Sequence, residues 1–210
     1  MNRSTLLSLL GSLVIGAAAL QAGTVTYQVT VDTSGFAANT PGFIDFQFNQ
    51  ASTNSLTGLA SIDSFTSTGY TFNDSLNYVT SGITGSFSSL PVVIPNDAGG
   101  TNVFARGVTS FGSNFTALVT LSGNVVGGTA GDPSQFFVIL EDTNGASLFP
   151  TLGLVGEIAT VTVNTDGSTT PSVNSFAGGS AYAGAPTPEP SSILLGVAGL
   201  AALATRRRRA

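Results

Sequence analysis

Acidic side chains are the main candidates for chemistry in this 210-residue chain, because the sequence contains no His, Cys, Lys or Trp. That composition excludes disulfide frameworks, thiolate or imidazole metal sites, Cys or His nucleophiles, Schiff bases and P-loop phosphate binding. A glycosidase would need two facing carboxyl groups about 5 to 9.5 Å apart. The linear spacing of Asp45, the Glu141–Asp142 dipeptide and Glu157 does not pair them. We therefore predict that the protein is not an enzyme, with a carboxylate-based hydrolase as the alternative.

Acidic loop residues raise the question of a calcium site, because Asp side chains and loop carbonyls are ligands that calcium prefers. The candidates are Asp32 and, in the run Asp-Thr-Asn-Gly, Asp142 with Asn144. That run is a fragment of a calcium-loop pattern without the closing Glu, and a hairpin with an Asx turn explains it equally well. We predict no cofactor and no metal site, and structural calcium is the alternative.

A carbohydrate platform would need exposed aromatic rings, and without Trp only Tyr and a few Phe residues could supply them. Tyr27 falls on the apolar face of its segment and is assigned to the core. Tyr70 and Tyr78 flank a polar loop and are the candidate platform residues. A carbohydrate-binding module is therefore the alternative function.

Charge divides the chain into a middle and two ends. All six basic residues are Arg, and only Arg106 lies between residues 23 and 188, where ten of the eleven acidic residues lie. The middle is therefore near −9, although the net charge of the whole chain is −5. We predict no nucleic-acid partner for so acidic a surface. Arg106 is expected to lay its stem along a strand or to pair with an acid.

The middle of the chain shows the period-two alternation of β-strands rather than helical spacing. In the run over 43–48, for example, Ile44, Phe46 and Phe48 share one face. The segment 135–141 is nearly all apolar, as expected of a strand that is covered on both faces. The predicted strands are 25–32, 43–48, 59–65, 83–90, 103–108, 115–121, 135–141 and 158–163.

Eight or nine short strands separated by turn signals predict an all-β fold. We expect an antiparallel β-sandwich of jelly-roll type over residues 23–180, with an N-terminal signal helix and a C-terminal transmembrane helix. Residues 181–187, rich in Gly, Ala and Pro, are predicted to be a flexible linker.

The first 22 residues have the layout of a secretory signal peptide that directs the chain to the Sec export machinery. Arg3 precedes an apolar run over 6–20, which is shorter than the span of about 20 residues that a bilayer needs. Cleavage is predicted between Ala22 and Gly23, with cleavage after Ala19 as one alternative and a buried N-terminal helix as the other.

A second short apolar segment lies near the C-terminus. Pro188, Glu189, Pro190 and Ser191 precede an uncharged stretch over 193–205, and a basic cluster follows at Arg206, Arg207, Arg208 and Arg209. Such a basic cluster stays on the cytoplasmic side of the inner membrane. The segment therefore has the physical character of a stop-transfer element that holds the precursor in the membrane transiently.

Together these features resemble the PEP-CTERM sorting signal of Gram-negative bacteria, here over residues 188–210. The resemblance implies that an exosortase, a membrane-embedded Cys protease-transpeptidase, recognises Pro-Glu-Pro and removes the helix. It also implies a final place at the cell surface or in the extracellular matrix, associated with exopolysaccharide and biofilm. We therefore expect a non-enzymatic exported protein. The alternative is an ordinary tail anchor with the same topology and no processing.

The order of elements in the middle also resembles an uncharacterised group of exported PEP-CTERM proteins. The matching segments are Thr30–Gly35, Gly42–Phe48 and Phe136–Asp142. This resemblance supports the β-sandwich expectation and assigns no activity.

Overall fold

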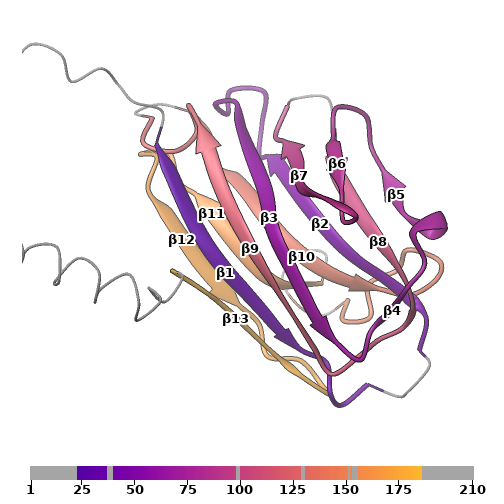
Figure 1. Cartoon of the computed structure of the whole chain (residues 1–210). Helices are drawn as coiled ribbons and strands as arrows, with labels where there is room; N and C mark the ends of the chain where they lie inside the picture. The colour runs from indigo at the N-terminus through magenta and orange to yellow at the C-terminus, as the bar shows by residue number, and fades with distance from the viewer. Residues whose placement is uncertain are drawn as a thin grey trace, which may run out of the picture.

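Two antiparallel β-sheets packed face to face make up the domain in the computed structural model (Figure 1). The structure describes residues 23–36, 40–97, 100–128, 131–150, 152 and 156–185. The prediction of an all-β antiparallel sandwich is confirmed. The predicted signal helix and transmembrane helix both lie outside the described residues.

Each sheet combines strands from distant parts of the chain. Sheet A has the order β13 (Ser180–Gly184), β1 (Thr24–Asp32), β9 (Asn114–Gly123), β3 (Gly58–Thr68), β7 (Ser89–Pro95) and β6 (Thr84–Ser86). Sheet B has the order β12 (Thr169–Val173), β11 (Glu157–Val163), β10 (Ser134–Glu141), β2 (Gly42–Gln50), β8 (Val103–Ser110) and β4 (Thr71–Phe72). The short strand β5 (Tyr78–Val79) also pairs with β8, and a single 3-10 turn, η1 (Asp74–Leu76), precedes it.

The core between the sheets follows the predicted alternation. On β2, Ile44, Phe46 and Phe48 point inward and are fully buried. Tyr27 on β1 also belongs to the core, and its hydroxyl lies 2.7 Å from Thr169 Oγ1 on β12. Because successive strand residues point to opposite faces, the same register sends Phe43, Asp45 and Gln47 to the outer face of sheet B.

The outer face of sheet B is itself largely buried around β2. Val103, Ala105, Phe137 and Ile139 are buried, yet they do not belong to the cluster between the sheets. Ala105 on β8 and Ile139 on β10 both lie directly opposite Asp45. β10 is therefore covered on both faces, as its apolar sequence predicts, and Asp45 lies on an apolar floor.

One predicted strand is wrong. The run predicted as a single strand over 83–90 contains a hairpin, in which β6 ends at Ser86 and β7 begins at Ser89. The pairing between these two strands is irregular, because Thr84 lies opposite Val93 while Ser86 lies opposite Ser89. Apolar content alone does not reveal so tight a reversal.

The C-terminal boundary of the sandwich also differs from the expectation. Residues 180–184 form β13 and pair with β1 from Asp32↔Ser180 to Gln28↔Gly184, so residues 181–184 are not part of a flexible linker. Ala181 and Ala183 pack against the core, and the pairing covers a long strand edge that would otherwise be open. The rest of the predicted linker, residues 186–187, lies outside the described residues.

The core predicts a sharp difference between two apolar truncations. Phe46→Ala removes a fully buried ring between the sheets and should lower the free energy of unfolding by about 3–5 kcal/mol. Leu76→Ala removes a side chain that is 46% exposed and should change it by about 0.5 kcal/mol or less. Urea unfolding followed by circular dichroism measures both, and equal losses would contradict the assignment of the core.

Candidate functional site

Two carboxyl groups lie together on the outer face of sheet B. β2 and β10 are antiparallel neighbours, with Ile139 opposite Asp45 and Glu141 opposite Phe43. Asp45 and Glu141 are therefore diagonal neighbours on one face, within reach of each other's side chains. The expectation that these carboxylates are unpaired is wrong, because cross-strand contact cannot be read from linear spacing.

Asp45 is the buried member of the pair, and Glu141 is only partly buried. Asp45 is only 1% exposed, and its Oδ2 accepts a hydrogen bond of 2.5 Å from Gln47 Nε2. Gln47 Oε1 in turn accepts a hydrogen bond of 2.9 Å from Asn49 Nδ2, which holds the amide in place. Among the described residues, Asp45 Oδ1 is buried without a hydrogen-bond donor from an amide or hydroxyl group.

Burial and mutual contact change the pKa of both acids. Burial raises the pKa of Asp45 to about 6, while hydrogen bonds with Gln47 and Glu141 act in the opposite direction. Burial also raises the pKa of Glu141 to about 8, and the charge of Asp45 and a hydrogen bond with it add to the rise. Near neutral pH the pair therefore holds one proton, with Glu141 as its carrier and Asp45 as the acceptor.

A pocket of about 390 Å³ opens beside the pair. Its polar lining includes Asp45, Glu141 and Gln47, and its apolar lining includes Phe43 and the exposed ring of Tyr78. The remaining lining residues are Val103, Ala105, Thr143, Asn144 and Gly145. The pocket thus combines an apolar wall with a few polar groups, which is typical of small-molecule sites.

The loop at the pocket rim is shaped by its own hydrogen bonds. Asp142 Oδ1 accepts from the backbone N–H groups of Asn144, at 2.8 Å, and Ala146, at 3.0 Å. These bonds hold the pKa of Asp142 below its ordinary value. Gly145 takes a φ of +76°, which closes the turn at little cost because it has no Cβ.

The predicted calcium candidates form Asx-type turns in the structure. Asp32 Oδ1 accepts from the backbone N–H of Ser34 at 2.8 Å, as Asp142 does from its own loop. Within the described ranges no group of three or more His, Cys, Asp or Glu residues is arranged to hold a metal ion. Hydrogen bonding within the turns thus explains the aspartate residues at positions 32 and 142.

The two predicted platform tyrosines lie in different surroundings. Tyr78 is 59% exposed and lines the pocket beside the carboxyl pair. Tyr70 is half-buried: its ring stacks on Phe72 at 5.6 Å between centroids, and its hydroxyl lies 2.6 Å from Thr33 Oγ1. Burial raises the pKa of Tyr70 to about 12. Of these two rings, only Tyr78 is presented to a ligand.

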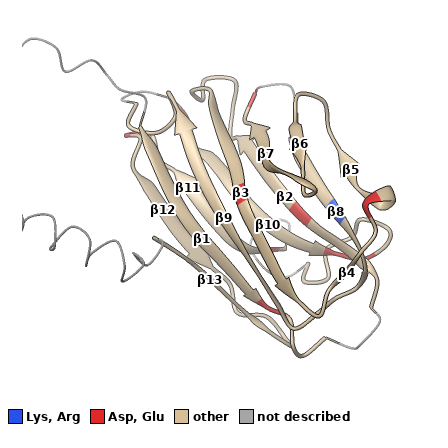
Figure 2. Cartoon of the chain, viewed as in Figure 1, with Lys and Arg blue, Asp and Glu red and all other residues tan. Residues whose placement is uncertain are grey.

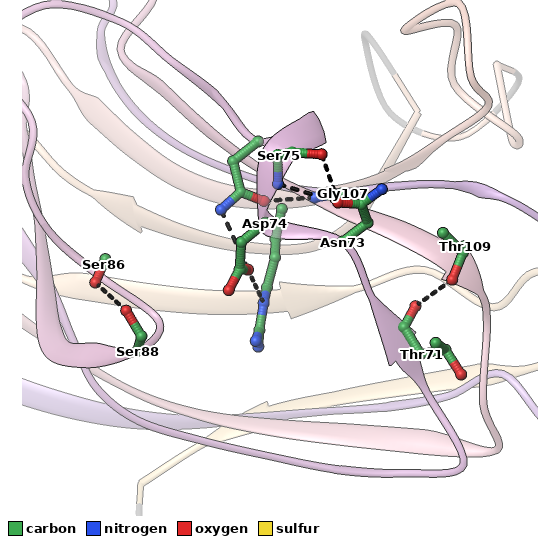
Figure 3. A network of polar contacts seen from close by, with 10 residues as sticks. Thr71, Asn73, Asp74, Ser75, Ser86, Ser88, Gly107 and Thr109 are labelled. Carbon is green, nitrogen blue, oxygen red and sulfur yellow. Dashed lines mark hydrogen bonds and ion pairs between the residues drawn. The ribbon is translucent and has the colours of Figure 1, made fainter.

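The guanidinium of Arg106 contacts neighbouring side chains within the fold. Figure 2 shows basic colour only on β8 within the described part of the chain. The guanidinium lies 3.6 Å from the ring centroid of Phe72 and 4.4 Å from that of Phe87, and Nε is 3.8 Å from Asp74 Oδ1. Figure 3 shows Asp74 among the polar contacts of η1. Ring stacking and this ion pair explain the position of the Arg106 side chain, and the ion pair with an acid is the one expected from the sequence.

The sequence did not reveal the pocket, because Asp45 and Glu141 are almost a hundred residues apart and meet only through the pairing of β2 with β10. A usable signal was present on β2, where the polar residues Asp45 and Gln47 alternate with the aromatic residues Phe46 and Phe48. That pattern indicates a polar outer face but does not identify the partner strand.

Both terminal segments lie outside the described residues, including the predicted cleavage residue Ala22, Pro188 to Ser191 and the cluster Arg206 to Arg209. Gly23 is the first described residue, and its N–H donates to Val126 O at 2.9 Å. Among the described residues there is no helix with the length and apolar character of a membrane span.

Comparison with known proteins identifies the C-terminal segment. Residues 186–209 match the family model described as the PEP-CTERM protein-sorting motif. No curated protein and no solved structure matches the chain. The chain therefore carries the PEP-CTERM sorting motif that its terminal residues predict, and this motif supports processing by an exosortase.

The carboxyl pair predicts a loss of stability on the alkaline side. The folded pKa of Glu141, about 8, exceeds its ordinary value of 4.5, so the stabilisation is complete below pH 4.5 and is lost as the pH rises through 8. We expect the free energy of unfolding to fall by about 1–2 kcal/mol between pH 5 and pH 9, after allowance for the solvent exposure of Glu141. Glu141→Gln should flatten this fall.

Denaturant unfolding at a series of pH values measures the effect. Asp32→Asn is the matched control, because the pKa of Asp32 is held below its ordinary value and its substitution should leave the fall unchanged. Identical pH profiles for the wild type and Glu141→Gln would show that the pair does not share a proton.

Proposed function

We propose that this PEP-CTERM protein is a non-enzymatic component of the cell surface or extracellular matrix, associated with exopolysaccharide. It is an exported protein, anchored transiently at the membrane and processed by an exosortase. The observation that carries the proposal is the sorting motif at residues 186–209, directly after the last strand of an acidic sandwich. The predicted signal peptide over residues 1–22 supports entry through the Sec machinery.

The side chains of the domain support a role without catalysis. It lacks the His, Cys and Lys residues that most nucleophilic and acid–base mechanisms use. Its one paired set of carboxyl groups within the described residues is in mutual hydrogen-bonding contact. A glycosidase instead needs its two carboxyl groups about 5 to 9.5 Å apart, on either side of the scissile bond.

Deleting Pro188 to Pro190 tests the sorting role. Without the tripeptide, we expect the full-length precursor to remain in the membrane fraction with its C-terminal segment attached. Intact mass measurement of the protein from the native host gives both cleavage points and any added glycan or lipid. Pro171→Ala, at an exposed position of β12 outside the motif, is the control. An unchanged mature C-terminus after the deletion would contradict processing at this motif.

Carbohydrate binding is the second candidate function, and the position of Tyr78 favours it. Its exposed ring lines a pocket that also contains carboxyl and amide side chains. Aromatic faces bind the apolar faces of sugar rings, while acids and amides bind hydroxyl groups.

Tyr78→Ala tests this candidate against the producer's own exopolysaccharide. We expect about tenfold weaker retention of the variant in a pull-down, since an exposed aromatic contact of about 1–1.5 kcal/mol is lost. Tyr182→Ala is the matched control, because Tyr182 is 53% exposed and lies on β13 in the other sheet. Equal retention of both variants would remove Tyr78 from the site, and no retention of the wild type would reject the candidate.

A further inference from the structure

We infer that the pocket on the outer face of sheet B is a binding site for a neutral sugar residue, with the Asp45 and Glu141 carboxyl groups bonded to its hydroxyls and the Tyr78 ring against its apolar face. This inference rests on the carbohydrate-binding candidate above. It adds the position of the site, the residues that form it and the class of sugar that it accepts.

The first support is the carboxyl pair beside the pocket. Asp45 is 99% buried, and its Oδ1 has no amide or hydroxyl donor among the described residues, so the proton carried by Glu141 supplies the hydrogen bond that it needs. Glu141 is less buried and lines the pocket, so its carboxyl group is the member of the pair that a ligand hydroxyl reaches first.

The second support is the mixed character of the lining. Phe43, Val103 and Ala105 make one part of the pocket apolar, while Gln47 and Asn144 bring amide groups to another part. A pyranose ring has the same division, with C–H groups on its faces and hydroxyls at its edge. The volume of about 390 Å³ suits one such ring with part of a neighbour.

The third support is charge. The pair of carboxyl groups contains one proton near neutral pH, which Glu141 donates to Asp45, so the remaining carboxyl oxygens accept from ligand hydroxyl groups. No basic residue lines the pocket, and Arg106 is held between the rings of Phe72 and Phe87. A uronic acid would bring a third carboxylate without a counter-charge, so we expect the site to reject it.

A bare cation fits the pocket less well than a sugar. Calcium takes six to eight oxygen ligands around its whole surface. Here Gln47 Oε1 already accepts from Asn49, and Phe43, Val103 and Ala105 occupy a large part of the lining. The two carboxyl groups alone leave most of the coordination sphere empty.

Glu141→Gln is the decisive variant, because it keeps the shape of the side chain, and its neutral amide should not destabilise the fold. The mature protein from the native host is applied to an array of neutral, amino and uronic-acid oligosaccharides. We expect the wild type to bind neutral glycans. Glu141→Gln should bind them about tenfold more weakly, because one charge-assisted hydrogen bond is lost. Asp32→Asn, on β1 in the other sheet and outside the pocket lining, is the matched control and should bind as the wild type does.

The outcomes separate the inference from the broader candidate. Neutral glycans bound equally by the wild type and Glu141→Gln would overturn the pocket and leave carbohydrate binding in place. An absence of neutral glycan binding by the wild type would overturn both. Thermal stabilisation by calcium alone, lost in Asp45→Asn and Glu141→Gln, would assign the pocket to a cation instead. Release of reducing ends from bound glycans would show hydrolysis and overturn the non-enzymatic proposal.

Discussion

The antiparallel pairing of β2 with β10 is the contact on which both the core and the pocket depend. Inward residues of this pair, such as Phe46 and Phe136, fill the space between the sheets, while the outward residues Asp45 and Glu141 form the polar end of the pocket. A slip of one residue would exchange the two faces and place a carboxylate among phenylalanine rings. The packing of the core therefore fixes the position of the carboxyl pair as well.

Strand register also fixes where the charged side chains lie. Arg106 lies opposite Ile44, so it points to the inner face, where aromatic rings surround it. It is the one basic side chain of the described domain, and its register keeps it away from Asp45 on the outer face. With no cation at hand, the buried carboxylate is balanced by a proton shared with Glu141.

Sequence reasoning succeeded where the signal is local. The alternation of Ile44, Phe46 and Phe48 predicted a buried face because a period of two belongs to a single strand. Strands of two to five residues, such as β5 and β13, were missed because their existence depends on a partner strand. Tyr78 was selected from composition alone. Its neighbours in the pocket could not be predicted, because they come from strands that meet only in the folded sheet.

The pairing of β13 with β1 joins the last strand of the sandwich to the first. A chain exported from its N-terminus presents β1 early, and sheet A stays incomplete until residue 184 has crossed. By then the sorting motif at residues 186–209 is the next segment to arrive at the membrane. The strand order therefore places the completion of the sandwich directly before the sorting motif in the chain.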